Sequence, residues 1–422
     1  MMSEKTQHGW TFDKLGNYVK LQGGNAFKSR DFKDNGIPLL RIANIRNNGI
    51  ELDGIAYIDD EIAKTYSSYL LKESNVVIAM SGATTGKTGI IKKENLPLLL
   101  NQRVGVFKIK KDNFMIQDYL RFVVQSSYFQ NVIKIDAIGG AQPNISPKQI
   151  ESIHVYIPPL DEQQKIAAIL SSVDKAIDKT KEIIEETETV KKGLMQQLLI
   201  NGIRSHNFKV SPIGSIPEAW QVLSFNKVFD RIRTKNYNNN QNVLTISGEK
   251  GLVNQLDYFN KSVSSKNLSN YIYLEKGDFA YNKSYSNGYP LGAIKMLDKY
   301  DNGVVSTLYI CFRLKQPYLQ SFYKHYFDSG LWNRQVYNIA PEGGRSHGLL
   351  NVGVKDFFEI LIPVPSIEEQ QEISDRINAI EYKKEIEQKK LSKLTNIKQG
   401  LMQQLLTGKV RVPINEDEEV PS

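Results

Sequence analysis

The sequence predicts an α+β protein in which two mixed α/β domains alternate with two long helices. Three observations support this prediction: a block of about 200 residues occurs twice, each block ends in a long helical pattern, and short strand-like segments precede that helix in the same order. A chain of 422 residues is also too long for one ordinary hydrophobic core. Two copies indicate a duplication rather than a solenoid.

Two motifs define the repeat, and both recur 207 residues later. Gly193 to Leu199 (GLMQQLL) recurs unchanged as Gly400 to Leu406. Upstream, Pro158 to Ile166 (PPLDEQQKI) recurs as Pro365 to Ile373 (PSIEEQQEI). Further pairs with nearly the same spacing are Trp10 with Trp220 and Asn144 with Asn351.

The second part of each block is predicted to be a helix of about 40 residues. In the first helix a 3-4-3-4 spacing, typical of a coiled-coil seam, joins Ile166, Ile169, Val173, Ala176, Thr180, Ile183, Thr187, Val190 and Leu194. The second helix repeats this seam less regularly, and Lys384 and Glu387 interrupt it in its middle. Ser366 with Glu369 forms a capping-box pattern, and an Asn-Gly or Thr-Gly pair ends each helix. We expect the helices to pack on each other as an antiparallel coiled coil, rather than each on its own domain.

The first part of each block contains β-branched and aromatic runs of strand length. Expected strands are 37–42, 75–80, 104–109 and 153–157, then 243–246, 278–281, 308–313 and 358–362; expected helices before the last strand are 116–130 and 317–337. The strand-like segments align between the copies, whereas most other residues differ. The expected divisions are domains at 1–159 and 205–365, helices at 160–204 and 366–410, and a disordered acidic tail at 411–422.

Composition narrows the function. The net charge is +8 with a pI of about 9.1, and residues 1–160 and 205–366 carry net charges of +5 and +6. Basic domains of this kind fit nucleic-acid binding, although ordinary globular domains also reach such values. The one cysteine excludes an intramolecular disulfide and a cysteine-rich zinc site. No signal peptide or membrane span is evident, so we expect a cytoplasmic protein without a membrane partner.

Catalytic patterns are weak. Gly82 to Thr88 (GATTGKT) has three residues between its glycines, whereas a phosphate-binding P-loop needs four. It reads either as a structural glycine turn or as a turn that contacts DNA. No methyltransferase cofactor loop with an Asn-Pro-Pro-aromatic motif is found, and the five histidines lack metal-ligand spacing. Asp59, Asp60 and Glu61 fit a helix cap better than a nuclease cluster. We therefore expect no catalytic site and no metal site.

Taken together, the motifs resemble the specificity (S) subunits of Type I restriction–modification systems. The resemblance rests on the two PPLDEQQKI-like motifs, the two GLMQQLL motifs, and IGSIPEAW at residues 213–220. MSGATTGKT at 80–88 and LNQRV at 100–104 also resemble family patterns. The second copy departs from the first, since NKSYSNG at 282–288 stands where SGATTGK stood.

This resemblance implies a non-catalytic DNA-recognition subunit in a heteromeric complex. Each mixed domain would be a target-recognition domain reading one half of a bipartite, asymmetric site in double-stranded DNA. The helices would hold the domains apart and dock two methyltransferase (modification) subunits, joined by restriction (endonuclease/translocase) subunits. The chain itself would bind no cofactor, because S-adenosylmethionine and ATP belong to the partners.

Lys and Arg are expected on phosphates, and Arg, Asn, Gln or Ser on base edges. Candidate DNA-binding residues of the first copy are Arg41, Asn44, Arg46, Asn47, Thr84, Thr85, Lys87, Gln102 and Arg103. Those of the second copy are Arg231, Arg233, Lys235, Ser247, Lys250, Lys283, Tyr285, Arg345, Ser346 and His347.

The sequence leaves other functions open for the chain. These alternatives are an S-like subunit of another defence system, a standalone DNA-binding protein, a self-contained restriction–modification enzyme, and a coiled-coil scaffold.

Overall fold

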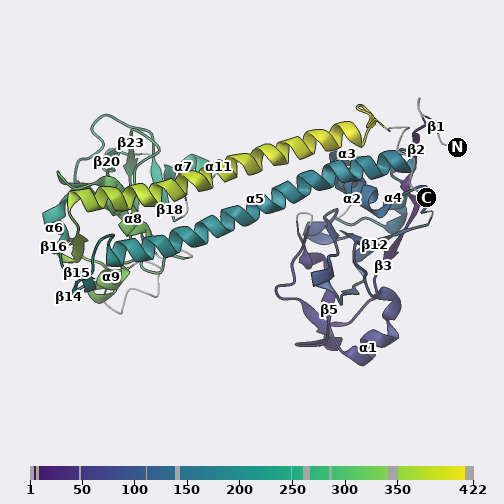
Figure 1. Cartoon of the computed structure of the whole chain (residues 1–422), viewed down its shortest axis with the longest axis horizontal. Helices are drawn as coiled ribbons and strands as arrows, with labels where there is room; N and C mark the ends of the chain where they lie inside the picture. Colours follow the sequence, from purple (N-terminus) through teal and green to yellow (C-terminus); the bar gives the residue numbers. More distant parts are fainter. Residues whose placement is uncertain are drawn as a thin grey trace. The chain divides into compact units, whose positions relative to one another are not determined.

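The chain divides into two compact units, and each unit takes part of both long helices. Unit 1 comprises residues 1–181 and 389–422, and unit 2 comprises residues 182–388. The computed structural model describes residues 4–5, 9–46, 49–110, 112–137, 143–248, 250–259, 267–284, 288–340 and 350–413 (Figure 1). Among these residues, no helix is both long and apolar enough to cross a bilayer.

The two long helices are α5 (Leu160–Asn201) and α11 (Ile367–Leu405). In unit 1, Lys398 of α11 pairs with Asp174 of α5 at 2.6 Å. In unit 2, Lys191 pairs with Glu381, and Lys384 pairs with Glu188, both at 2.5 Å. Residue numbers fall along α11 as they rise along α5, so the helices pack side by side and antiparallel, as predicted (Figure 1). The lysine that interrupts the predicted seam thus has a carboxylate partner, and its hydrogen bond lowers the pKa of Glu188.

The predicted seam of α5 is mostly correct. Its positions from Ile166 to Thr187 are buried or half-buried, and the hydroxyls of Thr180 and Thr187 donate to carbonyls one turn earlier, so these polar residues are satisfied inside the seam. Val190 is the exception. Its side chain is 59% exposed, so placing it in the seam was wrong. Lys191 occupies the interhelical position instead, paired with Glu381.

Each unit contains the same four-stranded antiparallel sheet, with the same order of strands. In unit 1 the order is β10 (Thr88–Ile90), β9 (Val76–Ala79), β12 (Val104–Ile109) and β3 (Val19–Gly23). In unit 2 it is β22 (Ala293–Met296), β21 (Phe279–Asn282), β24 (Ile310–Leu314) and β17 (Phe229–Arg231). A further antiparallel pair precedes each long helix: β2 (Thr11–Lys14) with β13 (His154–Ile157), and β16 (Gln221–Ser224) with β25 (Leu361–Val364). The short strand β1 (Glu4–Lys5) also pairs with β2.

Short helices pack on these sheets in matching places. Unit 1 has α2 (Gln117–Gln125), α3 (Ser127–Asp136) and α4 (Pro147–Ser152); unit 2 has α8 (Gln320–Asp328), α9 (Asn333–Ile339), α10 (Val354–Glu359) and α6 (Phe225–Val228). The single helices expected at 116–130 and 317–337 are each two helices. The first breaks at Ser126, whose hydroxyl caps α3, and the second breaks near Gly330, which has a φ of +74°.

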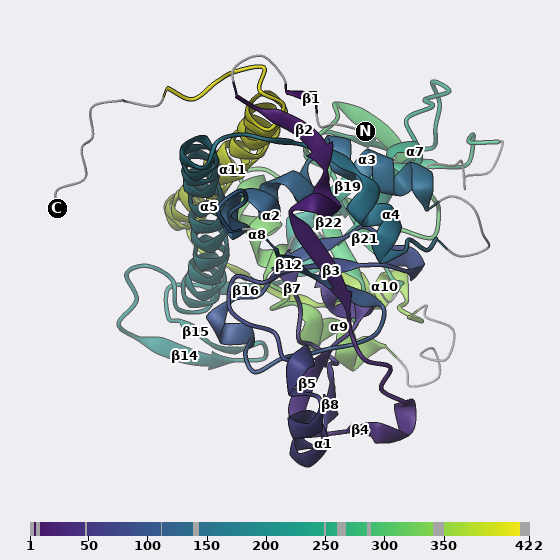
Figure 2. The ribbon, with the colours of Figure 1, turned by 90° about the vertical axis from the view of Figure 1, so that its right-hand side faces the viewer.

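Outside this shared scaffold the units differ. Unit 1 adds a sheet in the order β11 (Leu99–Leu100), β5 (Ile37–Leu40), β8 (Ala56–Ile58) and β4 (Phe32–Lys33), a hairpin of β6 (Ile45–Arg46) and β7 (Gly49–Ile50), and α1 (Asp60–Thr65), which Asp59 caps as predicted. Figure 2 shows β4, β5, β8 and α1 gathered on one side of unit 1. Unit 2 has separate two-stranded pairs: β14 (Phe208–Ser211) with β15 (Gly214–Pro217), β18 (Leu244–Ser247) with β19 (Gly251–Asn254), and β20 (Ile272–Glu275) with β23 (Asn302–Val305), beside α7 (Gln255–Phe259).

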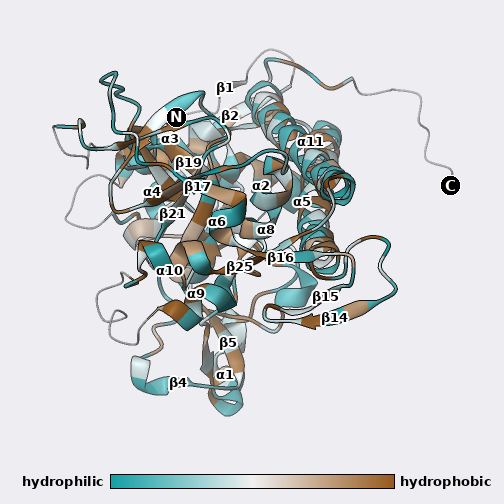
Figure 3. Ribbon diagram, turned by 90° about the vertical axis from the view of Figure 1, so that its left-hand side faces the viewer, coloured by the Kyte–Doolittle hydropathy of each residue, from teal (hydrophilic) through white to brown (hydrophobic). Residues whose placement is uncertain are grey.

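The core of each unit combines the start of one long helix with the end of the other. Unit 1 holds the start of α5 and the end of α11, and unit 2 holds the start of α11 and the end of α5. Met402 and Leu405 of α11, with Leu406 directly after the helix, join the core of unit 1 with Trp10 and Ile166. The corresponding Met195, Leu198 and Leu199 of α5 join the core of unit 2 with Trp220 and Ile373. Figure 3 shows hydrophobic residues recurring along the two helices among hydrophilic ones. The GLMQQLL repeat is therefore explained in part by core packing.

A glutamate, buried in unit 1 and half-buried in unit 2, links each domain to the start of its helix. Glu162 accepts a hydrogen bond from Trp10 Nε1 at 2.7 Å, and Glu369 accepts one from Trp220 Nε1 at 2.7 Å. Glu162 is also bound by Arg411, whereas Glu369 accepts from the backbone N–H of Ile203 at 3.0 Å. The predicted capping box at Glu369 is therefore incomplete, because its carboxylate serves the indole, although Ser366 accepts from the Glu369 N–H.

Replacing either glutamate should lower the unfolding free energy of the unit that contains it. Glu162→Gln removes the charge that Arg411 binds, and Glu369→Gln leaves one acceptor for two donors, so we expect losses of about 1–3 kcal/mol in unfolding free energy. The matched controls are the neighbouring exposed residues, Asp161→Asn and Glu368→Gln, which should change the unfolding free energy much less. Denaturant unfolding of the full chain measures both. Equal effects in variants and controls would contradict the structural role.

His325 of α8 is a second buried polar group, placed against α11 in unit 2. It has no exposed surface, its Nε2 lies 2.9 Å from Asn378 Oδ1, and its Nδ1 lies 4.0 Å from Glu381. Burial lowers the pKa of His325, and the positive charge of Lys324 in α8 lowers it further. The carboxylate of Glu381 acts in the other direction and raises it. The folded protein therefore favours neutral His325.

Unit 2 should consequently lose stability in acid. A histidine whose pKa is lowered by folding contributes its full stability above its unfolded pKa of about 6.5 and loses it as the pH falls. We expect the midpoint of thermal unfolding to fall more steeply between about pH 6.5 and 5 for the native chain than for His325→Gln, which cannot titrate. The exposed His154→Gln is the control. Identical pH profiles for the native chain and His325→Gln would rule the effect out.

Candidate nucleic-acid interface

The candidate residues gather at one end of each repeated sheet. We call it the loop end: in unit 1 it is where β3 and β9 finish and β12 begins, and in unit 2 it is where β17 and β21 finish and β24 begins. β3 and β9 are both antiparallel to β12, so their carboxyl ends meet its amino end. The same relation holds for β17, β21 and β24. Loops that leave a sheet at one end can present side chains together.

In unit 1, backbone and hydroxyl contacts join the three predicted segments. The Asn101 N–H donates to Leu40 O at 3.2 Å, which places the Gln102 turn beside Arg41. The Met80 N–H donates to Arg103 O at 2.9 Å, and the Thr84 hydroxyl donates to Ile42 O at 3.1 Å. Segments 41–46, 81–87 and 102–103 therefore form one continuous surface.

Several predicted residues hold this surface together from within. Asn44 is only 4% exposed, accepts from the Arg41 N–H and donates to Glu51 O. Arg41 donates to Gly54 O at 3.0 Å and lies over the ring of Phe32. Such contacts favour a structural role, because donors used inside the fold are not free for bases.

Thr84 and Thr85 are used in the same way. The Thr85 hydroxyl lies 2.7 Å from Gly82 O and 3.1 Å from Pro143 O. The amides of Gly82, Thr85, Gly86 and Lys87 all donate to backbone carbonyls of unit 1. These amides cannot also wrap a phosphate, so the geometry supports a structural turn rather than a nucleotide-binding loop.

Few of the predicted DNA-binding side chains of unit 1 remain at its surface without a role inside the fold. Gln102 and Arg103 are exposed, and they make no side-chain hydrogen bond or ion pair with a described residue. Lys87 is half-buried, and Arg46 is exposed with a 3.2 Å contact to Glu51. Asn47 lies outside the described residues.

Unit 2 presents a row of cations at the corresponding end. Arg231, Arg233 and Lys235 are exposed, while Ile232 between them is 9% exposed and packs inward. Neither arginine makes a hydrogen bond or ion pair with another described residue, whereas Lys235 donates to Asn270 Oδ1 at 3.0 Å. Two unpaired guanidinium groups fit contacts with phosphates or guanine edges.

The remaining predictions in unit 2 separate into two kinds. Ser247 is 6% exposed and accepts from the Lys250 N–H, so it shapes the β18–β19 turn, whereas Lys250 is exposed. Lys283 lies at the loop end, where its carbonyl accepts from the Leu350 N–H at 3.0 Å and its Nζ lies 3.5 Å from Val352 O. Tyr285, Arg345, Ser346 and His347 lie outside the described residues.

One pair of residues was missed by the sequence analysis. Thr307 and Leu308 are exposed, Leu308 by 62%, in the turn before β24 that corresponds to the Gln102 turn before β12. An exposed leucine next to a threonine can contact a thymine methyl group. Aligning the two turns before the central strands would have revealed this pair, because Thr307 and Leu308 then stand where Gln102 and Arg103 stand in unit 1.

Within the part of the chain that the structure describes, no group of three or more His, Cys, Asp or Glu side chains is arranged to hold a metal ion. Cys311 is a free thiol buried in β24, and burial raises its pKa, which keeps it in the unreactive thiol form.

Comparison with known families identifies the repeated domain. The model of the Type I restriction modification DNA specificity domain matches residues 7–189 and again 217–396. The chain belongs to this family. The two matches also show that the family's domain occurs twice here, as the internal repeat predicted.

Relatives named as specificity subunits align along almost the whole chain. The Type I restriction enzyme MjaVIII specificity subunit of Methanocaldococcus jannaschii is 27% identical, over 97% of this chain and 96% of its own. The EcoKI specificity subunit of Escherichia coli K12 is 23% identical, over 97% and 91%. The likeness to these relatives thus includes both copies of the repeat.

Solved structures show the same fold. The crystal structure of the S subunit from M. genitalium has a TM-score of 0.55 at 15% identity, covering 96% of this chain and 99% of that one. A chain from work on complex assembly and conformational transition of the type I R-M system has a TM-score of 0.57 at 13% identity, covering 96% and 100%. At such identities the likeness establishes the fold.

The loop ends can be tested by removing one free guanidinium from each. Arg103→Ala and Arg233→Ala should each weaken DNA binding, by about 1–3 kcal/mol if the group reads a base, or lower the salt slope by about 1 if it contacts a phosphate. Matched controls are Lys110→Ala and Lys315→Ala, which sit past the opposite ends of β12 and β24 and donate to Gly16 O and Asn226 O. Fluorescence anisotropy at several salt concentrations measures the affinity. Equal losses in variants and controls would exclude the loop ends as the interface.

Proposed function

We propose that this chain is the non-catalytic DNA-recognition subunit of a Type I restriction–modification complex. Each unit reads one half of a bipartite, asymmetric site in double-stranded DNA through its loop end. The supporting observation is that the same sheet end in both units carries basic or polar side chains that make no hydrogen bond or ion pair with another described residue. The scaffolds match while their loops differ. Different loops on equal scaffolds suit two different half-sites.

The helices would carry the partners. In this proposal two methyltransferase subunits dock on α5 and α11, and restriction subunits join them to make the endonuclease. S-adenosylmethionine and ATP are bound by those partners, and this chain holds no cofactor. The chain supplies sequence recognition and positions the partners relative to the DNA.

Methylome sequencing of the host tests this function directly. Deleting the chain should abolish methylation at one motif with two specific parts and an unread spacer. A single uninterrupted motif would contradict two separate readers. Methylation by the purified chain alone would show an enzyme, and an unchanged methylome would favour a standalone DNA-binding protein.

Lengthening both helices together should change the spacer and leave the half-sites intact. Seven residues added after Lys181 and seven after Gln388 keep the heptad register in each unit, and they extend the pair by about 10 Å, or roughly three base pairs. We expect the methylated motif to gain about three base pairs of spacer. The matched control inserts seven residues into α5 alone, which leaves α11 unmatched. Altered half-site sequences in the double insertion would show that the domains are not independent readers.

A further inference from the structure

The far end of the repeated sheet, opposite the loop end, carries a closed ion-pair cluster in unit 2. It lies where β24 finishes and β17 begins. Arg313 of β24 donates from Nε to Asp278 at 2.6 Å and from a second nitrogen to Glu275 at 2.6 Å. Asp230 of β17 stands directly opposite Arg313, and Lys315 pairs with this aspartate at 3.3 Å. The charges at this end are therefore compensated within unit 2.

Unit 1 has the same backbone framework at its far end but different side chains. Lys72 donates its N–H to Asn75 Oδ1 at 3.0 Å, and Asn75 donates its N–H to Lys72 O at 3.1 Å. Glu275 and Asp278 make the same two bonds, at 2.8 and 2.9 Å. These turns lead into β9 and β21, so a lysine and an asparagine take the places of the two carboxylates.

The strand positions of the two far ends correspond as well. Lys108 of β12 stands directly opposite Lys20 of β3, as an arginine and an aspartate do in unit 2. Lys110 and Lys315, two residues further on, each donate to a backbone carbonyl just before the edge strand. The four positions thus hold three lysines and an asparagine in unit 1, against one arginine and three carboxylates in unit 2. We call Lys20, Lys72 and Lys108 the lysine cluster.

No described carboxylate compensates the lysine cluster. Among the described residues none forms an ion pair with its three lysines, and this includes the exposed Glu73 in the turn. Lys108 is half-buried, and its Nζ lies 3.5 Å from Asn75 Oδ1. Burial lowers the pKa of Lys108, and the positive charge of Lys72 lowers it further. Like charges directly opposite each other destabilise an antiparallel sheet, so a bound anion would relieve this repulsion.

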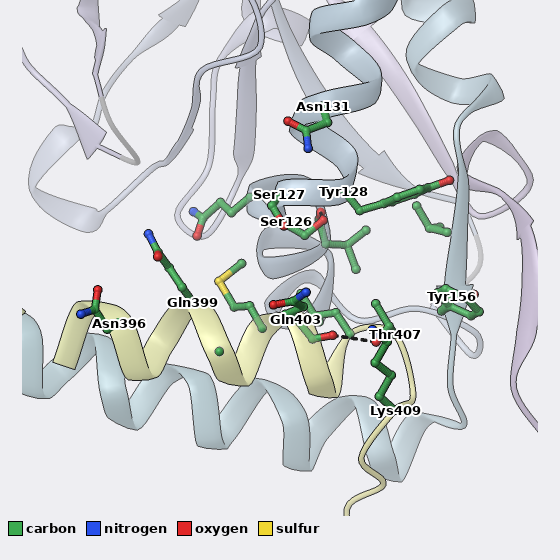
Figure 4. A pocket seen from close by; sticks show the side chains of 16 residues that line it. Ser126, Ser127, Tyr128, Asn131, Tyr156, Asn396, Gln399, Gln403, Thr407 and Lys409 are labelled. Carbon is green, nitrogen blue, oxygen red and sulfur yellow. Dashed lines mark hydrogen bonds between the residues drawn. The ribbon is translucent and has the colours of Figure 1, made fainter. Parts of the chain in front are cut away.

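A hollow elsewhere in unit 1 is a poorer place for an anion. It has a volume of ≈ 730 Å³, and Figure 4 shows Gln399 and Gln403 of α11 across from Tyr128 and Asn131 of α3. Of the described residues that line it, only Lys409 is charged. One ammonium group attracts an anion less than three that lie together. The lysine cluster is therefore the better anion site of the two.

We infer that the lysine cluster binds phosphates of the DNA backbone, at a distance from the bases that unit 1 reads. Lysine binds phosphate as a point charge, and three ammonium groups suit neighbouring phosphates of one backbone. β12 connects the cluster to the loop end, because Lys108 follows Arg103 by five residues. Five residues of strand span about 17 Å, which corresponds to roughly five base pairs of duplex. The inference rests on the proposed function, under which unit 1 holds DNA at its loop end.

This backbone contact belongs to unit 1 alone. In unit 2 the same positions carry more negative than positive charge, which disfavours a phosphate. The two half-sites are therefore held unequally, since unit 1 adds a salt-dependent contact beside its half-site and unit 2 depends on its loop end. Contacts to phosphates fix the register of a protein on the duplex without reading its sequence. The lysine cluster thus positions the DNA and does not select its bases.

The test uses the complex of the full chain with its methyltransferase subunits, and a duplex that contains the methylated motif. Replacing Lys20, Lys72 and Lys108 together by glutamine should reduce the slope of log affinity against log salt by roughly 2–3, because each phosphate contact contributes about 0.9. Ethylation of single phosphates maps the contact. The triple variant should lose the interference that the native complex shows roughly five base pairs from the bases nearest Arg103, while the methylated motif stays the same.

Two further variants separate a DNA contact from a folding defect. Lys72→Glu with Asn75→Asp copies the turn of unit 2 and gives Lys108 a carboxylate partner. This variant should unfold at a midpoint no lower than the native chain, and it should still lose the same interference. The matched control replaces three exposed lysines elsewhere in unit 1 by glutamine, which removes equal charge and should leave the interference pattern intact; these are Lys28, Lys33 and Lys64.

Each outcome decides the question. Failure of the native complex to bind the duplex would overturn the proposed function, whereas native binding with an unchanged slope and pattern in the cluster variants would overturn only the lysine cluster. With the slope unchanged, inorganic phosphate that raises the unfolding midpoint of the native chain but not of the triple variant would show a free-phosphate site. Weaker binding of the methyltransferase subunit to the triple variant would instead show an acidic protein partner. Either result overturns the assignment to DNA.

Discussion

The hydrogen bond between a carboxylate and a tryptophan indole at the start of each long helix is the contact on which the rest of each unit depends. Glu162 and Glu369 each accept the indole N–H of a fully buried tryptophan, and the next residue, Gln163 or Gln370, is also fully buried. Gln163 accepts from the Ile116 N–H and donates to Pro158 O and Phe114 O. Gln370 likewise accepts from the Leu319 N–H and donates to Pro365 O. Buried polar groups tolerate few alternative arrangements, because an unpaired one costs about 1–3 kcal/mol. The Glu–Gln pair therefore fixes how the α2 or α8 region, the last strand and the helix meet.

A glycine that follows the other long helix packs against the tryptophan at each of these contacts. Gly202 follows α5 with a φ of +67° and would place a Cβ 3.2 Å from the Trp220 ring, and Gly408 follows α11 with a φ of +70° and approaches Trp10 equally closely. Positive φ and the tight approach both suit glycine. Each unit is thus assembled from the start of one helix and the end of the other. Cohesion of unit 1 requires residues near both ends of the chain, including Arg411 on Glu162.

Because these contacts hold each scaffold together away from the loop ends, the loop ends can differ between the units. The sheets keep the same strand order, while unit 1 adds a second four-stranded sheet and unit 2 adds separate two-stranded pairs. At the loop ends the turn before the central strand carries Gln102 and Arg103 in one unit and Thr307 and Leu308 in the other. Scaffold contacts are buried and mutually dependent, so they resist change, whereas surface loops accept new side chains at little cost. Two readers of one architecture can therefore address different sequences.

The candidate site was predictable as segments rather than as residues. Turns 41–46, 81–87 and 102–103 were all recognised from their polar composition, and hydrogen bonds join them at one sheet end. Sequence could not tell which members face inward, because polarity is the same for a side chain that bonds the backbone and for one that meets a ligand. Asn44 and Thr85 are of the first kind in the structure, and Arg103 is exposed. Leu308 was missed for the converse reason, since an apolar residue reads as core until its exposure is known.

The sequence by itself determined the duplication, the two helices and the family, because periodicity and an exact repeat are local properties that survive without a fold. Tertiary structure decided which helix half belongs to which unit, and it broke the helices expected at 116–130 and 317–337, where Ser126 and Gly330 satisfy turns that packing selects. In the structure Val190 is exposed and does not belong to the predicted seam. Heptad spacing specifies a face of the helix, but only the contact between Lys191 and Glu381 shows which residue meets the neighbouring helix.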